Sequence, residues 1–301
     1  MRAYHPLNQS LLYKITTRRK LAAVFGMTEA ALQSIIAMPK PFSSRDLEIT
    51  RNGVTKVRHV QEPRGPLRPV HNRVRRLLSR IEPPAFLFCP VKGRCYVTNA
   101  ALHAGAKEIR KLDIQKYFPS TPEHRVYWFF NTVMQCSTDV ASILAKLLTA
   151  DGHLATGSTV SPILSYYAFR DMWLNIADIA HAAGCTLSVY VDDLNISGDH
   201  VPESLMWKIR QQVHSRGLGY HKERHFHGGK GEVTGVFIRN GQVLLPNRQR
   251  KKVYDLRSAL REATDPIEVD SLRRKLQGLL TQQKQIQNYA PNRDIVATHT
   301  L

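Results

Sequence analysis

The sequence lacks the patterns that mark several common protein classes. Its four cysteines include no Cys-x-x-Cys pair, so neither a zinc ribbon nor a disulfide framework is indicated, and we interpret them as reduced thiols of a cytoplasmic protein. No apolar signal segment stands at the N-terminus, and no uncharged stretch has the length of a membrane span, so we expect no membrane attachment. What remains is a globular chain of 301 residues with an ordinary hydrophobic content of 43%.

Acidic residues are scarce relative to basic ones. The chain has 43 Lys and Arg against 24 Asp and Glu, a formal net charge of +19, which indicates a polyanionic partner such as nucleic acid. The excess of basic residues is unevenly distributed along the chain: net charge is +15 over 1–112, −1 over 113–245 and +5 over 246–301. A neutral middle between two basic ends suits a protein that neutralises phosphates around a site that needs its own carboxylates.

Local patterns predict an α+β chain without internal repeats or low-complexity tracts. Helical spacing of apolar residues and the capping and breaking residues set the expected elements. We expect helices within 10–38, a hairpin over 46–62 turning at Asn52-Gly53, a basic amphipathic helix over 70–81, helices over 122–149 and 161–182, and a helix-rich segment 247–290 interrupted near Asp265-Pro266.

The most informative stretch is 187–197, where an apolar alternation runs up to two adjacent aspartates, Asp192 and Asp193, and resumes after them. This pattern predicts a strand, a tight turn and a second strand, with the carboxylates exposed at the tip of a rigid hairpin. Adjacent aspartates also occur in turns for local hydrogen bonding alone, so this stretch by itself leaves both interpretations open.

A second carboxylate segment favours a catalytic role for Asp192 and Asp193 over a purely local role in a turn. Asp113 ends a short predicted strand, just before the aromatic pair Tyr117-Phe118. Two hard divalent cations about 3.5–4 Å apart need oxygen ligands from at least two elements, and one aspartate from each of two neighbouring strands can supply them. Such a pair of ions serves in-line phosphoryl transfer, by activating an attacking hydroxyl and neutralising the leaving pyrophosphate.

These residues carry a resemblance to a known family. Tyr190-Val191-Asp192-Asp193 resembles the Tyr-x-Asp-Asp signature of reverse transcriptases, and Leu112-Asp113 with the following Tyr-Phe-Pro-Ser is similar to the strand that carries their other catalytic aspartate. The resemblance implies an RNA-directed DNA polymerase that uses two Mg²⁺ ions, with Mn²⁺ as a substitute. It implies that Asp113, Asp192 and Asp193 are catalytic and, with Ile114, bind metal, and that Arg58, Phe118, Gly157 and Tyr190 bind the nucleotide, Phe118 as the gate against a ribose 2′-hydroxyl.

Two further motifs resemble those of retron reverse transcriptases. Asn99 to His103 fits an Asn-Ala-x-x-His pattern, and Val233-Thr234-Gly235 fits a Val-Thr-Gly pattern. Each is weak alone, since Asn99 could be a helix cap and Val-Thr-Gly a strand end, but they stand in the right order around both aspartates. By this resemblance we place RNA and template binding at Asn99, His103, Val233, Thr234 and Gly235, with Arg73, Arg76 and the basic region around Lys251.

The sequence departs from the family at two places. Thr156 stands where the family has a Gln before the helix that supports the templating base pair, which puts fidelity or processivity in doubt. The residue that protonates pyrophosphate is a Lys in the family, whereas here the simplest register puts Arg224 there, and Arg is a poor proton donor. Lys222 and His221 could donate instead, and the sequence leaves these alternatives open.

Three histidines in the same segment, His221, His225 and His227, have a spacing that could suggest zinc. No Cys-x-x-Cys and no nearby carboxylate pair completes a ligand set in the sequence. We therefore interpret them as polar histidines of a turn near nucleic acid.

The fold that the resemblance implies is a right-hand polymerase with an antiparallel palm sheet. We expect a helical N-terminal extension (1–45), fingers (46–106 and 120–165), a palm (107–119 and 166–245) and a helical thumb (246–301). Expected partners are a cognate structured noncoding RNA, its DNA product in a branched RNA–DNA molecule (msDNA) primed from a 2′-hydroxyl, dNTPs, and a separate effector protein in anti-phage defence. Alternatives are a reverse transcriptase of another bacterial lineage, an RNA-binding protein whose polymerase site has decayed, and a two-metal nuclease.

Overall fold

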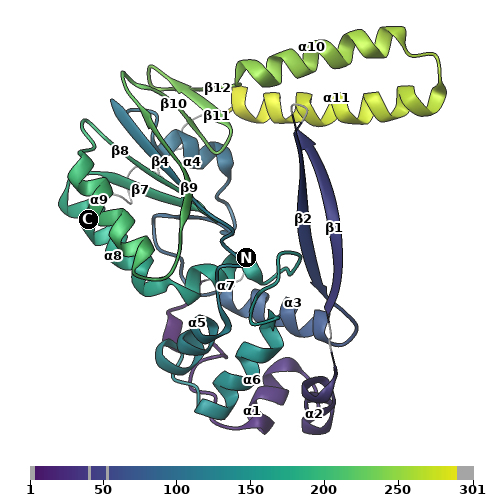
Figure 1. Cartoon of the computed structure of the whole chain (residues 1–301), viewed down its shortest axis with the longest axis vertical. Helices are drawn as coiled ribbons and strands as arrows, with labels where there is room; N and C mark the ends of the chain where they lie inside the picture. Colours follow the sequence, from purple (N-terminus) through teal and green to yellow (C-terminus); the bar gives the residue numbers. More distant parts are fainter. Residues whose placement is uncertain (1–3, 40–41, 52–53, 290–301) are drawn as a thin grey trace.

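A five-stranded sheet forms the centre of the molecule (Figure 1). The computed structural model describes residues 4–39, 42–51 and 54–289. The strand order is β3-β7-β8-β4-β9, and all neighbours are antiparallel except the short edge strand β3, which runs parallel to β7. The expected antiparallel sheet therefore has one parallel edge. The strands are β3 (Leu87–Cys89), β4 (Glu108–Ile114), β7 (Thr186–Tyr190), β8 (Asp193–Gly198) and β9 (Tyr220–Phe226).

The two faces of this sheet pack against different layers. Helices α8 (Arg170–Ala182) and α9 (Glu203–His214) lie on one side (Figure 1). On the other side a small core joins Ile109 to α4 (Tyr96–Leu102) and to a three-stranded sheet. That sheet has the strands β10 (Lys230–Val233), β11 (Val236–Arg239) and β12 (Gln242–Leu244). Successive side chains of β4 point to opposite faces of the sheet, so Ile109 packs in this small core and Leu112 in the main core. The sheet thereby separates the two cores.

A helical lower body holds the N-terminal part of the chain (Figure 1). The expected helices within 10–38 are present, and the predicted helix over 70–81 begins earlier, at Leu67. The two long predicted helices are each broken: a π-helical turn and Gln135 with φ 55° divide the first, and the buried Phe169 divides the second. The elements are η1 (Leu7–Gln9), α1 (Arg18–Phe25), α2 (Glu29–Ala37), α3 (Leu67–Leu78), α5 (Glu123–Trp128), η2 (Phe129–Val133), α6 (Thr138–Leu148), β5 (Thr149–Ala150), β6 (His153–Leu154) and α7 (Ser161–Ala168).

Two hairpins project from different parts of the molecule: the β-hairpin from the helical lower body, and the helical hairpin from the three-stranded sheet (Figure 1). The β-hairpin of β1 (Phe42–Arg51) and β2 (Val54–Pro63) is the predicted one, with Cα pairs from Phe42↔Pro63 to Arg51↔Val54; its Asn52-Gly53 turn lies outside the described residues. The helical hairpin of α10 (Asn247–Glu262) and α11 (Pro266–Gln287) breaks where Asp265-Pro266 predicted, because the Asp265 carboxylate caps α11 by accepting from the backbone N–H groups of Ile267 and Glu268.

No single helix among the described residues is both long and apolar enough to cross a membrane. The pair α1 and α2 satisfies the length and composition only when joined, and it is bent by 94°.

Candidate functional site

The three predicted aspartates lie together at one end of the central sheet. Strands β7 and β8 form the predicted hairpin, with Tyr190 paired to Asp193, and β8 in turn pairs Asp193 with Asp113 of β4. The backbone N–H of Ile114 donates to the carbonyl oxygen of Asp192 at 2.9 Å, which fixes the hairpin tip against the end of β4. Two segments almost 80 residues apart in the sequence are thereby joined at the site.

The hairpin tip is conformationally strained. Val191 has a φ of 61°, a left-handed conformation that is unfavourable for a β-branched residue. This conformation turns the chain between β7 and β8 so tightly that Asp192 occupies the tip itself. Strain of this kind costs about 1–3 kcal/mol and persists where the surrounding structure imposes it.

The carboxylates repel one another electrostatically. Burial, and then the neighbouring charges of Asp193 and Asp113, raise the pKa of Asp192 from 3.8 to about 6. Burial and the charge of Asp193 also raise the pKa of Asp113, while Lys111, His221 and Lys222 oppose this shift. A divalent cation would relieve this repulsion, and oxygen-only donors from two strands are the ligands that Mg²⁺ takes, so the residues present fit such an ion.

Lys111 is a site residue that sequence reasoning missed. Its ammonium group lies 2.9 Å from the carboxylate of Asp193, and both side chains are largely buried. The signal was available, because Lys111 stands two residues before Asp113 on the same strand and therefore on the same face. The pair gives Asp193 a fixed cation of its own, unlike Asp113 and Asp192.

Strand β9 brings its basic residues to the same site. Lys222 is paired with Asp113, and Arg224 with Lys111, so both stand on the face of the sheet that carries the aspartates. A register shift follows, because Ile114 pairs with Tyr220 and leaves His221 as the extra residue of a bulge. The register therefore sets Lys222, and not Arg224, directly beside Asp113.

The aromatic residues next to the aspartates have different surroundings. Tyr117 is buried, donates its hydroxyl to the carbonyl oxygen of Ser165 at 3.0 Å and accepts from the indole of Trp173 at 2.9 Å. Phe118 is half-buried against it, with ring centroids 6.1 Å apart. Burial and the neighbouring Cys89 thiol raise the pKa of Tyr190 to about 12. Tyr117 anchors this segment, and Phe118 keeps a partly exposed ring.

The two motifs Asn99 to His103 and Val233 to Gly235 meet in space. Thr234, with φ 46°, and Gly235 form the tight turn between β10 and β11, and the hydroxyl of Thr234 donates to the carbonyl oxygen of Tyr96 at 2.8 Å and accepts from the amide of Asn99 at 3.4 Å. The imidazole of His103 has hydrogen bonds of 2.6 and 2.7 Å to the hydroxyls of Ser197 and Ser188.

The side chains of Asn99, His103 and Val233 are 0% exposed. In this structure they join elements to one another, and a direct contact with RNA would require that they become exposed first. Burial gives these three side chains a packing role in the described structure, and RNA binding at these positions stays a prediction.

The predicted nucleotide-binding residues Arg58 and Gly157 lie on and against β2. Arg58 is exposed at mid-strand, opposite Leu47. Gly157 donates its N–H to the carbonyl oxygen of Gln61 at 2.9 Å, and a Cβ there would stand 2.5 Å from Glu62 and 2.8 Å from that same oxygen. Glycine is thus required at 157 for the close approach of two backbones. Thr156 beside it is half-buried.

The remaining predicted RNA contacts divide between buried and exposed positions. Arg73 donates to the carbonyl oxygen of Val24 at 2.8 Å and so joins α3 to α1, whereas Arg76 on the same helix is exposed. On α10 the consecutive cations Arg250, Lys251 and Lys252 are all exposed.

Comparison with known proteins gives one consistent group of relatives. No protein-family model matches the sequence. The chain is 23% identical to the retron Se72 reverse transcriptase of Salmonella heidelberg over 77% of its length, 28% identical to the retron Mx65 reverse transcriptase of Myxococcus xanthus over 76%, and 23% identical to the retron Ec86 reverse transcriptase of Escherichia coli over 70%. The aligned region spans 64%, 58% and 68% of these relatives, so it covers less than two thirds of the first two.

Proposed function

We propose that this chain, a relative of the retron reverse transcriptases, is an RNA-directed DNA polymerase that acts within a retron. The observation that carries the proposal is the meeting of Asp113 with the Asp192–Asp193 hairpin tip at one end of the central sheet. Burial and neighbouring carboxylates raise the pKa of both Asp113 and Asp192, and such a perturbation is typical of functional sites and favours this proposal over a simple turn.

We assign the elements of the fold to the subdomains of a right-hand polymerase. The central sheet with α8 and α9 corresponds to a palm (107–119 and 166–245), the β1–β2 hairpin and the adjoining helices to fingers (46–106 and 120–165), and the α10–α11 hairpin to a thumb (246–301). The two helices α1 and α2 form the N-terminal extension (1–45). This assignment supports a basic path for nucleic acid between projecting hairpins, with the aspartates on the sheet.

The chain's own residues have distinct tasks in this proposal. Asp113 and Asp192, with the backbone at Ile114, would hold two Mg²⁺ ions or their Mn²⁺ substitutes, which activate the 3′-hydroxyl of the growing strand and neutralise the leaving pyrophosphate. Asp193, paired with Lys111, orients the hairpin tip. Lys222 stands beside Asp113 as the proton donor to pyrophosphate.

Selection of the incoming nucleotide rests on groups at the edge of this site. The half-buried ring of Phe118 excludes a ribose 2′-hydroxyl, so that the product is DNA, and Tyr190 at the end of β7 also binds the nucleotide. Arg58 meets the triphosphate, since a guanidinium group bonds phosphate oxygens in a bidentate manner. Gly157 supports Arg58 by holding strand β2 in place.

We propose a biological setting from the resemblance to retron reverse transcriptases. The template is a cognate structured noncoding RNA, priming uses a 2′-hydroxyl of that RNA, and the product is the branched RNA–DNA molecule msDNA. We also propose a cytoplasmic location, dNTPs as substrates and a separate effector protein in anti-phage defence. We propose that the exposed cations of α10 and Arg76 of α3 contact phosphates.

Substitution of a single aspartate tests this function. The chain is expressed with its flanking upstream DNA, and small nucleic acids are extracted from cells carrying the wild type, Asp192→Asn or the control Asp178→Asn, whose side chain is exposed on α8. We expect a discrete ribonuclease-resistant single-stranded DNA with the wild type and the control, and a loss of at least about 1,000-fold with Asp192→Asn, because removal of a metal ligand abolishes electrostatic stabilisation worth several kcal/mol.

Two outcomes would contradict the proposal. DNA of equal amount from the Asp192→Asn variant would show that this carboxylate is not catalytic. No DNA from any of the three proteins, with RNA binding intact, would indicate an RNA-binding protein whose polymerase site has decayed. Shortening of the wild-type product by debranching enzyme would support the branched molecule.

A further inference from the structure

A second cluster of potential metal ligands lies at the other end of strand β4. Glu108 begins β4, five residues before Asp113, which corresponds to about 17 Å along a strand. It also lies on the opposite face of the sheet. Glu108 shares its face of β4 with Arg110 and Leu112, whereas Asp113 shares the other face with Lys111 and Ile109. The cluster is therefore separate from the proposed polymerase site in both position and orientation.

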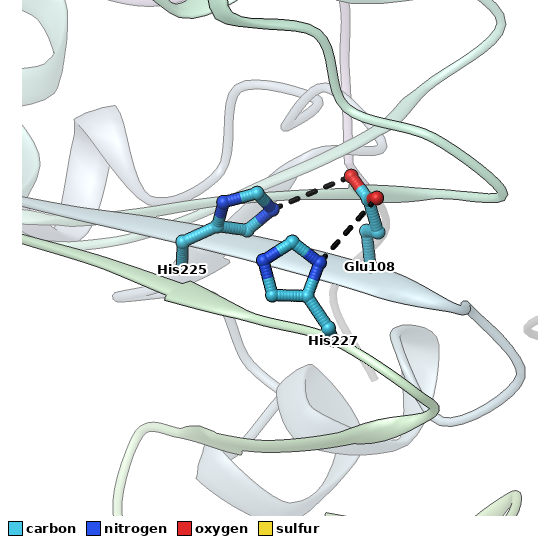
Figure 2. A group of neighbouring side chains, drawn as sticks. All are labelled: Glu108, His225 and His227. Carbon is cyan, nitrogen blue, oxygen red and sulfur yellow. Dashed lines mark hydrogen bonds and ion pairs between the residues drawn. The ribbon is translucent and has the colours of Figure 1, made fainter.

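Two histidines point at the carboxylate of Glu108 (Figure 2). His225 Nε2 lies 3.3 Å from Glu108 Oε2, and His227 Nδ1 lies 3.5 Å from Glu108 Oε1. The two imidazole rings are 3.7 Å apart between centroids. One donor atom from each of the three residues can be chosen so that all lie within 4.8 Å of one another.

These separations match those between ligands of one ion. With metal–ligand bonds of about 2.0–2.2 Å, donor atoms of a tetrahedral zinc site lie roughly 3.3–3.5 Å from one another. Two neutral imidazoles and one carboxylate also form a donor set that Zn²⁺ takes in proteins. His200 Nδ1 also lies 3.2 Å from Glu108 Oε1, but His200 is not one of the three residues whose donor atoms all lie within 4.8 Å of one another.

The ligands are held by rigid elements. His225 on β9 is paired with Arg110 on β4. His227 is the first residue after β9 and lies two residues after His225, so the two histidines share a face. The carboxylate of Glu108 is oriented by the backbone N–H of Val201, which donates to Oε2 at 2.9 Å. A hydrogen bond from outside the ligand set is the support that metal-binding carboxylates usually have.

We propose that Glu108, His225 and His227 form a structural Zn²⁺ site. The sequence showed the histidines but did not point to Glu108, because this residue is more than 100 positions away and reaches them only through strand pairing. The ion would fasten the corner between β9 and β10 to the start of β4. It would thereby hold the β10–β11 turn, which carries Thr234, in its contact with α4.

The test uses full-length protein, freed of any histidine tag and treated with chelator, and titrated with Zn²⁺ by calorimetry. We expect one Zn²⁺ per chain, with affinity at least about 100-fold weaker in His227→Ala and in Glu108→Gln, since even loss of a supporting partner costs 10–100-fold. His227 is 63% exposed, so its replacement should leave the fold intact. Co²⁺ in place of Zn²⁺ should give tetrahedral absorption bands in the wild type that His227→Ala lacks.

Two controls locate the ion. His181→Ala, at an exposed position on α8, and Asp113→Asn should both retain the wild-type affinity. Binding of less than about one equivalent, or equal affinity in His227→Ala and the wild type, would overturn the proposal. Loss of binding in Asp113→Asn with retention in His227→Ala would place the ion at the polymerase site instead. A melting temperature raised by Zn²⁺ in the wild type and unchanged in His227→Ala would support the structural role.

Discussion

At the scale of single residues, the cations around the three aspartates are not equivalent. Lys111 is committed to Asp193 by an ion pair of 2.9 Å, whereas Lys222 stands opposite Asp113 and is exposed. Arg224, two residues further along β9, stands opposite Lys111. A guanidinium group keeps its charge throughout the accessible pH range, while an ammonium group can lose its proton. Both position and chemistry therefore favour Lys222 as the proton donor.

The comparison of Lys222→Ala with Arg224→Ala tests this assignment. We expect Lys222→Ala to lower the rate of nucleotide addition by about 100-fold, the usual contribution of a general acid, and to remove the fall in rate at alkaline pH. Arg224→Ala should weaken nucleic-acid binding and leave the shape of the pH–rate profile unchanged. Single-turnover primer extension between pH 6.5 and 9.5 measures both.

Two results would count against this role for Lys222. Unchanged rates in both variants would remove the general acid altogether. A flattened alkaline limb in Arg224→Ala alone would assign the role to the residue that the sequence register first indicated. Lys222→Arg provides the matched variant, because it keeps the charge but holds its protons too tightly to act as a general acid.

At the scale of elements, His71 joins three segments of the helical body. It lies on α3 and is 0% exposed; its Nε2 donates to the carbonyl oxygen of Leu147 at the end of α6 at 2.8 Å, and its Nδ1 lies 2.6 Å from the hydroxyl of Ser158. A carbonyl can only accept, so the neutral ring with its proton on Nε2 satisfies both bonds. Burial lowers the pKa of His71 from 6.5 to about 4.

This lowered pKa predicts a loss of stability in acid. Between pH 6.5 and 4 the unfolded chain binds a proton that the folded chain does not, so the contribution of His71 is fully present above pH 6.5 and declines as the pH falls toward 4. The free energy of unfolding of the wild type should fall by about 3 kcal/mol more than that of His71→Gln over this range. Urea denaturation at pH 7.0, 5.5 and 4.5 measures the difference.

The control is His181→Gln, at an exposed histidine on α8, which should follow the wild type at every pH. Parallel curves for the wild type and His71→Gln would contradict a buried neutral imidazole. The element-scale consequence is that α3, α6 and the segment that carries Gly157 loosen together when His71 is charged.

At the scale of the whole molecule, the net charge of +19 predicts binding to RNA that weakens steeply with salt. Part of this charge projects on α10, where Arg250, Lys251 and Lys252 are exposed and distant in the sequence from the aspartates. Simultaneous replacement of these three residues by Ala should reduce the slope of log affinity against log salt by about 2, since each phosphate contact contributes roughly 0.7–0.9. Filter binding of the cognate RNA between 50 and 300 mM salt measures the slope.

Lys208→Ala serves as the control for this measurement, because Lys208 is exposed on α9, on the other side of the central sheet. Its slope should equal that of the wild type. An unchanged slope in the triple α10 variant would show that the helical hairpin does not contact phosphates, and would remove the main support for a thumb.

The sequence by itself determined the features that depend on neighbouring residues. Alternation around Asp192 predicted the β7–β8 hairpin, and Asp265-Pro266 predicted the break between α10 and α11. Asp113 at the end of a predicted strand predicted that carboxylates from two segments would lie together. These are local consequences of backbone geometry, hydrogen bonding and hydrophobic periodicity, so they can be read without the fold.

Only the tertiary structure decided which distant side chains meet. Strand register placed Lys222 opposite Asp113 and brought Glu108 to His225, and packing of the β10–β11 turn on α4 brought Thr234 to Asn99. The breaks within the predicted helices over 122–149 and 161–182 likewise arise where buried aromatic residues pack. A shift of one residue in pairing would move each side chain to the opposite face of the sheet, and that register is fixed by the burial of whole faces, which no local pattern contains.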